Sequence, residues 1–297
     1  MTMPSHVRLV EVGPRDGLQN ESTTLSKDVR VELIRRLMDC GLTHIEAGSF
    51  VHPQWVPQMA GTDAVLAELP LDGDTHFPVL VPNQNGLEKA LAAGVKEIAI
   101  FAAASETFSQ KNINCSIAES IRRFMPVVEQ AHRHGLKVRG YVSCVMGCPY
   151  EGAIAITAVV NVVRQLVDLG CYEISLGDTI GTGSPLMTQR IIESLANDLE
   201  INRLAVHFHD TYGQALANIY AALQLGVSVI DSSVAGLGGC PYAHGAGGNV
   251  ASEDVVHLLN GLGIAHGVNL DKLVDTGRYI CAQLDRPVMS RVNLAMA

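Results

Sequence analysis

Short apolar segments recur along the chain, and five of them complete the same unit: a helix-like stretch, one glycine, and an apolar run. The units read MDCGLTHIEAG, LAAGVKEIAIF, HRHGLKVRGYVS, VDLGCYEISLGD and LQLGVSVIDSS, with their glycines at Gly41, Gly94, Gly135, Gly170 and Gly226. A glycine directly after a helix can adopt the left-handed conformation that closes the last turn. Each unit therefore predicts a helix, a tight turn and a strand.

Three further apolar runs, VRLVEV, HFPVLVP and RLAVHFH, lack the glycine but have the same character. Together with the five units they predict eight strands, at residues 7–12, 43–47, 76–82, 95–101, 137–144, 172–176, 203–209 and 227–233. Most of the intervening stretches are periodic like a helix, as in the segment where Val31, Ile34 and Leu37 recur.

Strands that alternate with helices favour parallel pairing, and eight such units close naturally into a (β/α)8, or TIM, barrel. We expect residues 1–297 to form a single TIM-barrel catalytic domain, with residues 265–297 as a C-terminal helical tail. An open, doubly wound sheet is the alternative. It is disfavoured because no Gly-x-Gly-x-x-Gly motif follows the first strand.

Composition narrows the class of partner. The 297 residues are 47% hydrophobic, which is enough for one large core, and 30 acids against 21 lysines and arginines give a net charge of −9. A surface of that sign is unsuited to binding phosphate backbones, so we expect no nucleic-acid partner.

Neither the N-terminal sequence nor any apolar run indicates a membrane or an organelle. The start MTMPSHVRLVEV has no signal-peptide pattern, and the uninterrupted apolar run at residues 98–104 is far shorter than the roughly 20 residues of a membrane span. We expect a cytoplasmic protein whose seven cysteines are reduced.

Polar residues gather where the predicted strands end, which is the end of a barrel that carries its site. Arg15 and Asp16 follow the first strand, Glu46 ends the second, and Asp178 and Thr179 follow the sixth. The seventh strand carries His207 and His209, and a glycine-rich loop containing Cys240 leads to Asn249.

His207 and His209 are two residues apart on a strand, so both rings project to one face. They could be hydrogen-bonded core histidines. Their position beside Asp16 and Asp178 favours a metal site instead, and a mixed imidazole and oxygen ligand set without thiolate favours Mg²⁺ or Mn²⁺ over structural zinc.

Two further groups allow two interpretations each. Arg15 either forms a surface ion pair with Asp16 or neutralises an enolate, with Glu46 as its anchor or as a participant in the chemistry. Cys240 is either an inconsequential loop thiol or a proton donor and acceptor in a loop that can close over a ligand.

Several long motifs resemble one known family, the 3-hydroxy-3-methylglutaryl-CoA lyases, and the resemblance extends from about residue 7 to about residue 285. These motifs are EVGPRDGLQNE, SFVHPQWVPQM, KNINCS, RGYVSC with GCPYEG, EISLGDTIG, HDTYGQALAN and SVAGLGGCPYAHGAGGN. The resemblance implies a barrel lyase that cleaves 3-hydroxy-3-methylglutaryl-CoA to acetoacetate and acetyl-CoA with a divalent cation.

Matched motif by motif, the resemblance also implies the site. Its metal ligands fall on Asp16, His207, His209 and Asn249, and its catalytic groups on Arg15, Glu46, Asp178, His207 and Cys240. We expect substrate contacts from Arg15, Gln19, Ser49, Tyr141 and Thr179, an acyl-CoA thioester substrate, and a homodimer. The chain departs from the family pattern at two places. Position 208 is Phe where some relatives have cysteine, and the C-terminal tail lacks the terminal cysteine of some animal members. Both departures affect only what we expect about regulation.

The expected reaction is a retro-Claisen cleavage. The cation binds the tertiary hydroxyl, Arg15 stabilises the thioester enolate that departs, and Cys240 or His207 returns a proton to it. Asp178 and His207 are both candidates for removing the hydroxyl proton. The alternatives are the same chemistry on a longer 3-hydroxy-3-alkylglutaryl-CoA, a condensing synthase of the same superfamily, and a non-catalytic scaffold.

Overall fold

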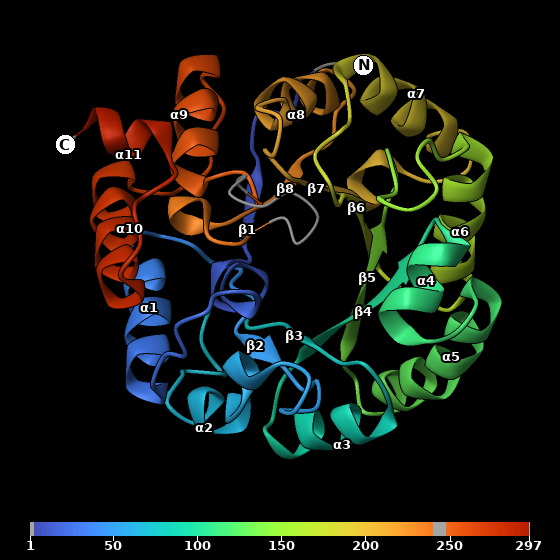
Figure 1. The fold of residues 1–297 in the computed structure, drawn as a ribbon, viewed down its shortest axis with the longest axis horizontal. Coiled ribbons are helices and arrows are strands. Elements are labelled where there is room, and N and C mark those ends of the chain that lie inside the picture. The colour runs from blue at the N-terminus through green and yellow to red at the C-terminus, as the bar shows by residue number, and fades with distance from the viewer. Residues whose placement is uncertain (1–2, 240–247, 297) are drawn as a thin grey trace.

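Eight parallel strands form a single sheet that curls around a central axis, with helices outside it (Figure 1). The computed structural model describes residues 3–239 and 248–296. The strands, in chain order, are β1 (Arg8–Glu11), β2 (Gly48–Ser49), β3 (Val79–Leu80), β4 (Glu97–Ala103), β5 (Lys137–Ser143), β6 (Glu173–Asp178), β7 (Leu204–Phe208) and β8 (Val229–Ser232).

The sheet closes on itself through its first strand. β1 pairs in parallel with β8 on one side, and on the other Glu11 exchanges backbone hydrogen bonds of 2.9 Å with His44 and Glu46. The predicted second strand at 43–47 therefore has its place in the ring, although regular pairing begins only at Gly48. A closed ring confirms the (β/α)8 barrel and rules out the doubly wound sheet.

The repeated glycine has the conformation that the sequence predicts. Gly41, Gly94, Gly135, Gly170 and Gly226 all have positive φ, between 75° and 103°. Each follows a helix, and four of them, Gly94, Gly135, Gly170 and Gly226, lie in turns of only three or four residues before the next strand. Such short turns place the longer loops at the opposite end of the barrel, where the strands end.

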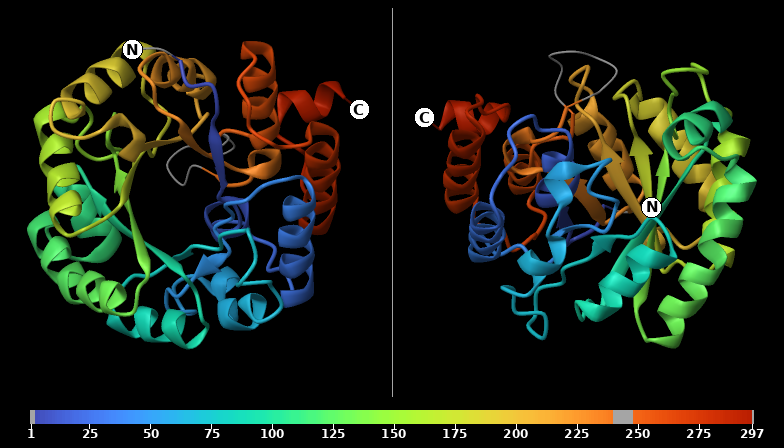
Figure 2. Two further views of the ribbon diagram at one scale, coloured as in Figure 1. Left: turned by 180° about the vertical axis from the view of Figure 1, so that it is seen from behind. Right: turned by 60° about the horizontal axis from the view of Figure 1, so that its bottom comes forward.

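The helices surround the sheet (Figure 2). Their apolar faces and the outward side chains of the strands form one large hydrophobic cluster. The helices are α1 (Lys27–Asp39), α2 (Thr62–Leu66), α3 (Gln84–Ala92), α4 (Glu106–Ile113), α5 (Ile117–Arg133), α6 (Ile156–Asp168), α7 (Pro185–Leu195), α8 (Ala215–Gln224), α9 (Ser252–Leu262), α10 (Leu270–Leu284) and α11 (Arg291–Ala295).

The described part of the C-terminal segment is helical and covers the closure of the barrel. Helix α10 packs against α1 and α9, and α11 packs against α9. Asp254 of α9 accepts hydrogen bonds from the Ser290 hydroxyl and from the backbone N–H of Arg291 and Val292, which fixes the start of α11.

Two simple expectations can be compared with the described residues. Within residues 3–239 and 248–296, no helix combines the length and apolar character of a bilayer span. The six cysteines in those ranges are buried free thiols, as predicted for a reduced protein.

Candidate functional site at the barrel mouth

A π-helical turn at Gly13–Gly17 lifts Arg15 and Asp16 to the mouth of the barrel. The carbonyl of Val12 accepts from the N–H groups of both Arg15 and Gly17, at 3.1 and 3.0 Å. Gly17 cannot be larger here, since an added Cβ would lie 2.6 Å from the Ser233 hydroxyl. The tight turn therefore aims two consecutive charged side chains at the interior.

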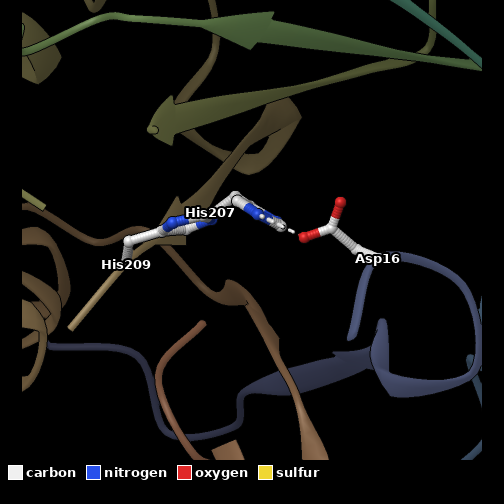
Figure 3. A group of neighbouring side chains, drawn as sticks. All are labelled: Asp16, His207 and His209. Atoms are coloured by element: carbon white, nitrogen blue, oxygen red, sulfur yellow. Dashed lines mark ion pairs between the residues drawn. The ribbon is translucent and has the colours of Figure 1, made fainter. Parts of the chain in front are cut away.

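Asp16, His207 and His209 converge at this mouth (Figure 3), with one ligand atom from each lying within 4.8 Å of the others. Both histidines project from the end of β7 on the same side, as their spacing predicts. Asp16 lies on the turn after β1, and β8 is the one strand between β1 and β7 in the sheet. Residues nearly 200 positions apart thus form one cluster.

Asn249 joins the same cluster. The chain at Asn249 runs antiparallel beside His209, and its side-chain amide donates to Asp16 Oδ2 at 2.9 Å and to the Leu237 carbonyl at 3.2 Å. Gly238 has a φ of +110°, and a Cβ there would lie 2.8 Å from the Asn249 amide nitrogen. A glycine at position 238 is needed for Asn249 to occupy this place.

The chemistry of this donor set fits a divalent cation. His209 is almost fully buried, and its Nδ1 has no hydrogen-bond partner among the described residues. Burial, and then the neighbouring His207, lower the pKa of His209 to about 4, so the ring is neutral and can ligate. Although burial opposes it, Arg15 and His207 keep the pKa of Asp16 well below its ordinary value, so Asp16 is a carboxylate.

Arg15 is buried beside the cluster. Its Nε donates to Glu46 Oε2 at 2.7 Å and its Nη1 to Asp16 Oδ1 at 2.5 Å, while the guanidinium lies 5.5 Å from the centre of the Tyr141 ring. Burial lowers the pKa of Arg15, but Glu46 and Asp16 more than offset this, so the group stays charged. The structure thus places a fixed cationic group next to the candidate ligands.

Tyr141 and His207 each contact both the residues at the mouth and the charged residues deeper in the barrel. The Tyr141 ring packs edge-on against His207, with centroids 5.8 Å apart, and its hydroxyl accepts from Arg139 at 2.9 Å. His207 lies between two carboxylates: its Nε2 is 3.6 Å from Asp16 and its Nδ1 is 3.3 Å from Asp231. Burial lowers the pKa of His207, but these two carboxylates raise it overall to about 9.

Asp178, one of the predicted catalytic residues, does not belong to the cluster. Asp178 accepts backbone N–H groups from Thr182 and Gly183 at 3.2 and 2.9 Å, and burial raises its pKa to about 6. Along β6, Glu173 and Ser175 face the interior, so alternation turns Asp178 to the opposite face. Its carboxylate holds the loop after β6.

Two of the predicted substrate contacts, Ser49 and Thr179, bond to backbone groups of the neighbouring strand or loop. The Ser49 hydroxyl donates to the Leu80 carbonyl and accepts from the Val51 N–H, and the Thr179 hydroxyl accepts from the Cys144 N–H. Gln19 is half-buried just after the turn that carries Arg15. The predicted catalytic Cys240 lies outside the described residues.

Sequence reasoning missed a charged layer directly beneath the cluster, formed by Arg139, Glu173, Ser175 and Asp231. Arg139 and Asp231 are each 1% exposed. Both are single charges inside apolar strands, VRGYV and VIDSS. Because charged residues are almost never fully buried without a partner, that pattern could have indicated an internal ion pair.

A closed (β/α)8 barrel with a largely buried His, Asp and Asn cluster at the carboxyl ends of its strands defines a class of barrel enzymes with a candidate divalent-cation site. The model of the HMGL-like family matches residues 6–280. The chain belongs to the HMGL-like family.

Relatives match over the whole chain. A Pseudomonas aeruginosa protein named 3-hydroxy-3-isohexenylglutaryl-CoA/hydroxy-methylglutaryl-CoA lyase is 57% identical over 100% of this chain and 99% of its own. A crystal structure of hydroxymethylglutaryl-CoA lyase from Pseudomonas aeruginosa, also 57% identical, superposes with a TM-score of 0.98 and covers 100% and 99% of the two chains.

A more distant solved structure is an HMG-CoA lyase from Acinetobacter baumannii in complex with coenzyme A and 3-methylmalate. It is 34% identical, has a TM-score of 0.93, and covers 99% of this chain and 95% of its own. The resemblance inferred from motifs is thereby confirmed at the level of the family.

Proposed function

We propose that this chain is a carbon–carbon lyase that cleaves 3-hydroxy-3-methylglutaryl-CoA to acetoacetate and acetyl-CoA. The observation that carries the proposal is the convergence of Asp16, His207 and His209 beside a buried Arg15, in a chain 57% identical to a named lyase of this kind. A condensing synthase is not favoured, because the relatives that match over the full chain are named lyases.

Asp16, His207, His209 and Asn249 would hold a divalent cation, Mg²⁺ or Mn²⁺. When bound, such a cation supplies Lewis acidity to substrate oxygens and makes a hydroxyl easier to deprotonate. The support for this assignment is the donor set, two imidazoles with oxygen ligands and no thiolate, together with the buried, unpaired Nδ1 of His209 among the described residues.

Arg15 stabilises the negative charge that develops on the thioester when the carbon–carbon bond breaks. A guanidinium has five N–H donors, so Arg15 can hold Glu46 and Asp16 and still donate to a substrate oxygen. Glu46 fixes the guanidinium orientation from a fully buried position. A preoriented cation of this kind requires little reorganisation when the charge appears.

Proton transfer needs one group to accept the hydroxyl proton and one to protonate the departing enolate. His207 and Asp178 are the proposed candidates for the first role, and Cys240 and His207 for the second. His207 has the geometric advantage, because it lies within the cluster, whereas the Asp178 carboxylate accepts from its own loop.

The substrate contacts proposed from the sequence are Arg15, Gln19, Ser49, Tyr141 and Thr179. Tyr141 has the strongest support, because its ring lies against both Arg15 and His207. A substrate with several negative charges approaches a protein of net charge −9, so Arg15, together with a bound cation, would supply the attractive field at the mouth.

We further propose a single catalytic domain over residues 1–297, a homodimer, and a cytoplasmic location. The hydrophobic cluster that extends from Val7 to Leu284 supports the single domain. The name of the bacterial relative carries no organelle, which is compatible with the cytoplasm.

The test is an acetoacetate assay with purified full-length protein and 3-hydroxy-3-methylglutaryl-CoA, with added Mg²⁺ or Mn²⁺ and with a chelator. Acetoacetate should form with metal and stop after chelation. Turnover that persists in chelator contradicts the metal role, and absence of product with either metal contradicts the lyase assignment. A parallel reaction with a 3-hydroxy-3-isohexenyl analogue shows whether the acyl pocket also admits a longer chain.

A further inference from the structure

His207 is oriented by a carboxylate that no metal-site prediction includes. Asp231, at the end of β8, places its Oδ2 3.3 Å from His207 Nδ1, on the side of the ring away from Asp16. A carboxylate only accepts hydrogen bonds, and Asp231 lies within hydrogen-bond distance of the ring whereas Asp16, at 3.6 Å, does not, so Nδ1 is the ring nitrogen that carries the proton in the neutral ring. The lone pair is then on Nε2, the nitrogen that faces Asp16.

Asp231 is itself held rigidly. Arg139 forms a two-pronged ion pair with it, at 2.7 Å to Oδ1 and 3.0 Å to Oδ2, and the Ser175 hydroxyl donates to Oδ2 at 2.8 Å. Arg139 is in turn fixed by Glu173, at 2.7 Å. The side chain of Asp231 is completely buried, so its direction toward His207 is set by three strands, β5, β6 and β8.

We propose that Asp231 is a positioning residue for the cation site: it fixes the tautomer and the ring plane of His207 so that Nε2 is presented to the ion beside Asp16. The inference rests on the metal site of the proposed function. Carboxylates that orient ligating histidines in this way commonly alter metal affinity by about 10- to 100-fold when removed.

Asp231 is not a further ligand. Its two oxygens already accept from Arg139 and Ser175, and it is not among the side chains whose ligand atoms cluster within 4.8 Å in the described residues. His209 provides the contrast within the same strand. Its Nδ1 has no partner in residues 3–239 and 248–296, so no described carboxylate dictates its tautomer.

A purely structural alternative makes Asp231 only the counter-charge of Arg139. The two roles separate in the variant Asp231→Asn. An asparagine can turn its NH₂ group toward His207 Nδ1, which favours the tautomer with its proton on Nε2 and blocks that nitrogen from the ion. Ser175→Ala is the matched control, since it removes one hydrogen bond to Asp231 but keeps the carboxylate, Arg139 and His207.

The experiment is Mn²⁺ titration of the purified full-length proteins by electron paramagnetic resonance, with thermal unfolding of the metal-free forms measured in parallel. Asp231→Asn should bind Mn²⁺ at least about 10-fold more weakly than the wild type, and Ser175→Ala within about 3-fold. Asp231→Glu keeps a carboxylate but displaces it, so it should bind Mn²⁺ several-fold more weakly than the wild type and more tightly than Asp231→Asn.

A folded Asp231→Asn variant that binds Mn²⁺ like the wild type overturns the inference. If that variant does not fold, Asp231→Glu decides, because its longer side chain displaces the carboxylate: wild-type affinity then overturns the inference and a several-fold loss supports it. A wild-type protein that binds no Mn²⁺ instead removes the proposed metal site, and with it the basis for a positioning role.

Discussion

Two charged groups lie one above the other inside the barrel, and they differ in how completely the protein pairs them. In the lower layer, Arg139, Glu173, Ser175 and Asp231 satisfy one another through hydrogen bonds of 2.7–3.0 Å. Among the described residues, none of the buried polar side-chain atoms of these four lacks a partner. The lower layer is complete without a ligand.

The mouth is paired less completely. His209 Nδ1 and Glu46 Oε1 are buried there without hydrogen-bond partners in the described chain. A buried polar group without a partner costs about 1–3 kcal/mol, so a group that bound at the mouth and engaged these atoms would remove that cost. The comparison separates two kinds of buried polar group: one is paired within the fold, and the other leaves atoms that the proposed cation or substrate could engage.

The largest expected effect comes from replacing Arg139, which pairs with both carboxylates of the lower layer. Arg139→Met leaves Asp231 and Glu173 as buried carboxylates without their cation, which should destabilise the protein by about 3–5 kcal/mol. Urea unfolding of the metal-free protein measures this. Arg164→Met, which removes an exposed ion pair to Asp198, is the control and should change stability by no more than about 0.5 kcal/mol. A loss below about 1 kcal/mol for Arg139→Met would contradict the supporting role.

Removing the Arg15 guanidinium from the mouth should reduce turnover rather than stability. Arg15→Met should reduce kcat by about 10²–10³-fold, equivalent to about 2.7–4 kcal/mol of transition-state stabilisation, with a smaller change in KM. Arg15→Lys should be nearly as impaired, because an ammonium cannot reproduce the fixed fork that engages Glu46 and Asp16. Steady-state kinetics at saturating Mn²⁺ measure both variants, and near-normal kcat in either one removes Arg15 from the chemistry.

Glu253 of α9 is a buried carboxylate that accepts hydrogen bonds but has no ion-pair partner among the described residues. Its effect on the stability of the fold should therefore depend on pH. Burial, reinforced by Glu11, raises the pKa of Glu253 to about 8, although Asn293 and the Ala235 N–H donate to it. The folded state therefore holds its proton more tightly than the unfolded state, whose pKa is near 4.5. This contribution is fully present below pH 4.5 and is lost as the pH rises toward 8.

Glu253→Gln should flatten that dependence. The unfolding free energy of the wild type should fall relative to the variant by up to about 1.4 kcal/mol for each pH unit between about 5 and 8. Denaturant unfolding at several pH values gives the difference directly, and subtraction cancels the other titrating groups. Parallel curves for the two proteins would show that Glu253 keeps an ordinary pKa.

The sequence was sufficient for the repeating architecture and for the cluster at the mouth. Helix–glycine–strand units are local signals, and the positive φ of Gly41 or Gly170 follows from steric preference alone. Asp16, His207, His209 and Asn249 were also within reach, because strand ends meet at one face of a barrel and the motifs resemble a known family.

The sequence marks Arg139 and Asp231 as single charges inside apolar strands, but it does not show that they pair with each other. Arg139 meets Asp231 across 92 positions, and neither residue stands in a recognisable motif with the other. Asp178 shows a related limit. Its place at a strand end predicted a role at the mouth, but whether a side chain at the last position of a strand turns inward depends on the register, which the sequence alone left open by one residue.

The smallest expected effect is at the C-terminal helices, where pairing is complete but remote from the mouth. The Ser290 hydroxyl donates to Asp254 at 2.7 Å and accepts from the Asn293 N–H at 3.1 Å, so it caps α11 from a fully buried position. Ser290→Ala should cost about 1–2 kcal/mol of stability, while the Mn²⁺ affinity stays within about 2-fold of the wild type. Thermal unfolding and Mn²⁺ titration of one preparation test both statements. A loss of Mn²⁺ affinity that matches the loss of stability would contradict the prediction. It would mean that the cation site at the mouth depends on the C-terminal helices, including α11, as well as on the charged layer beneath it.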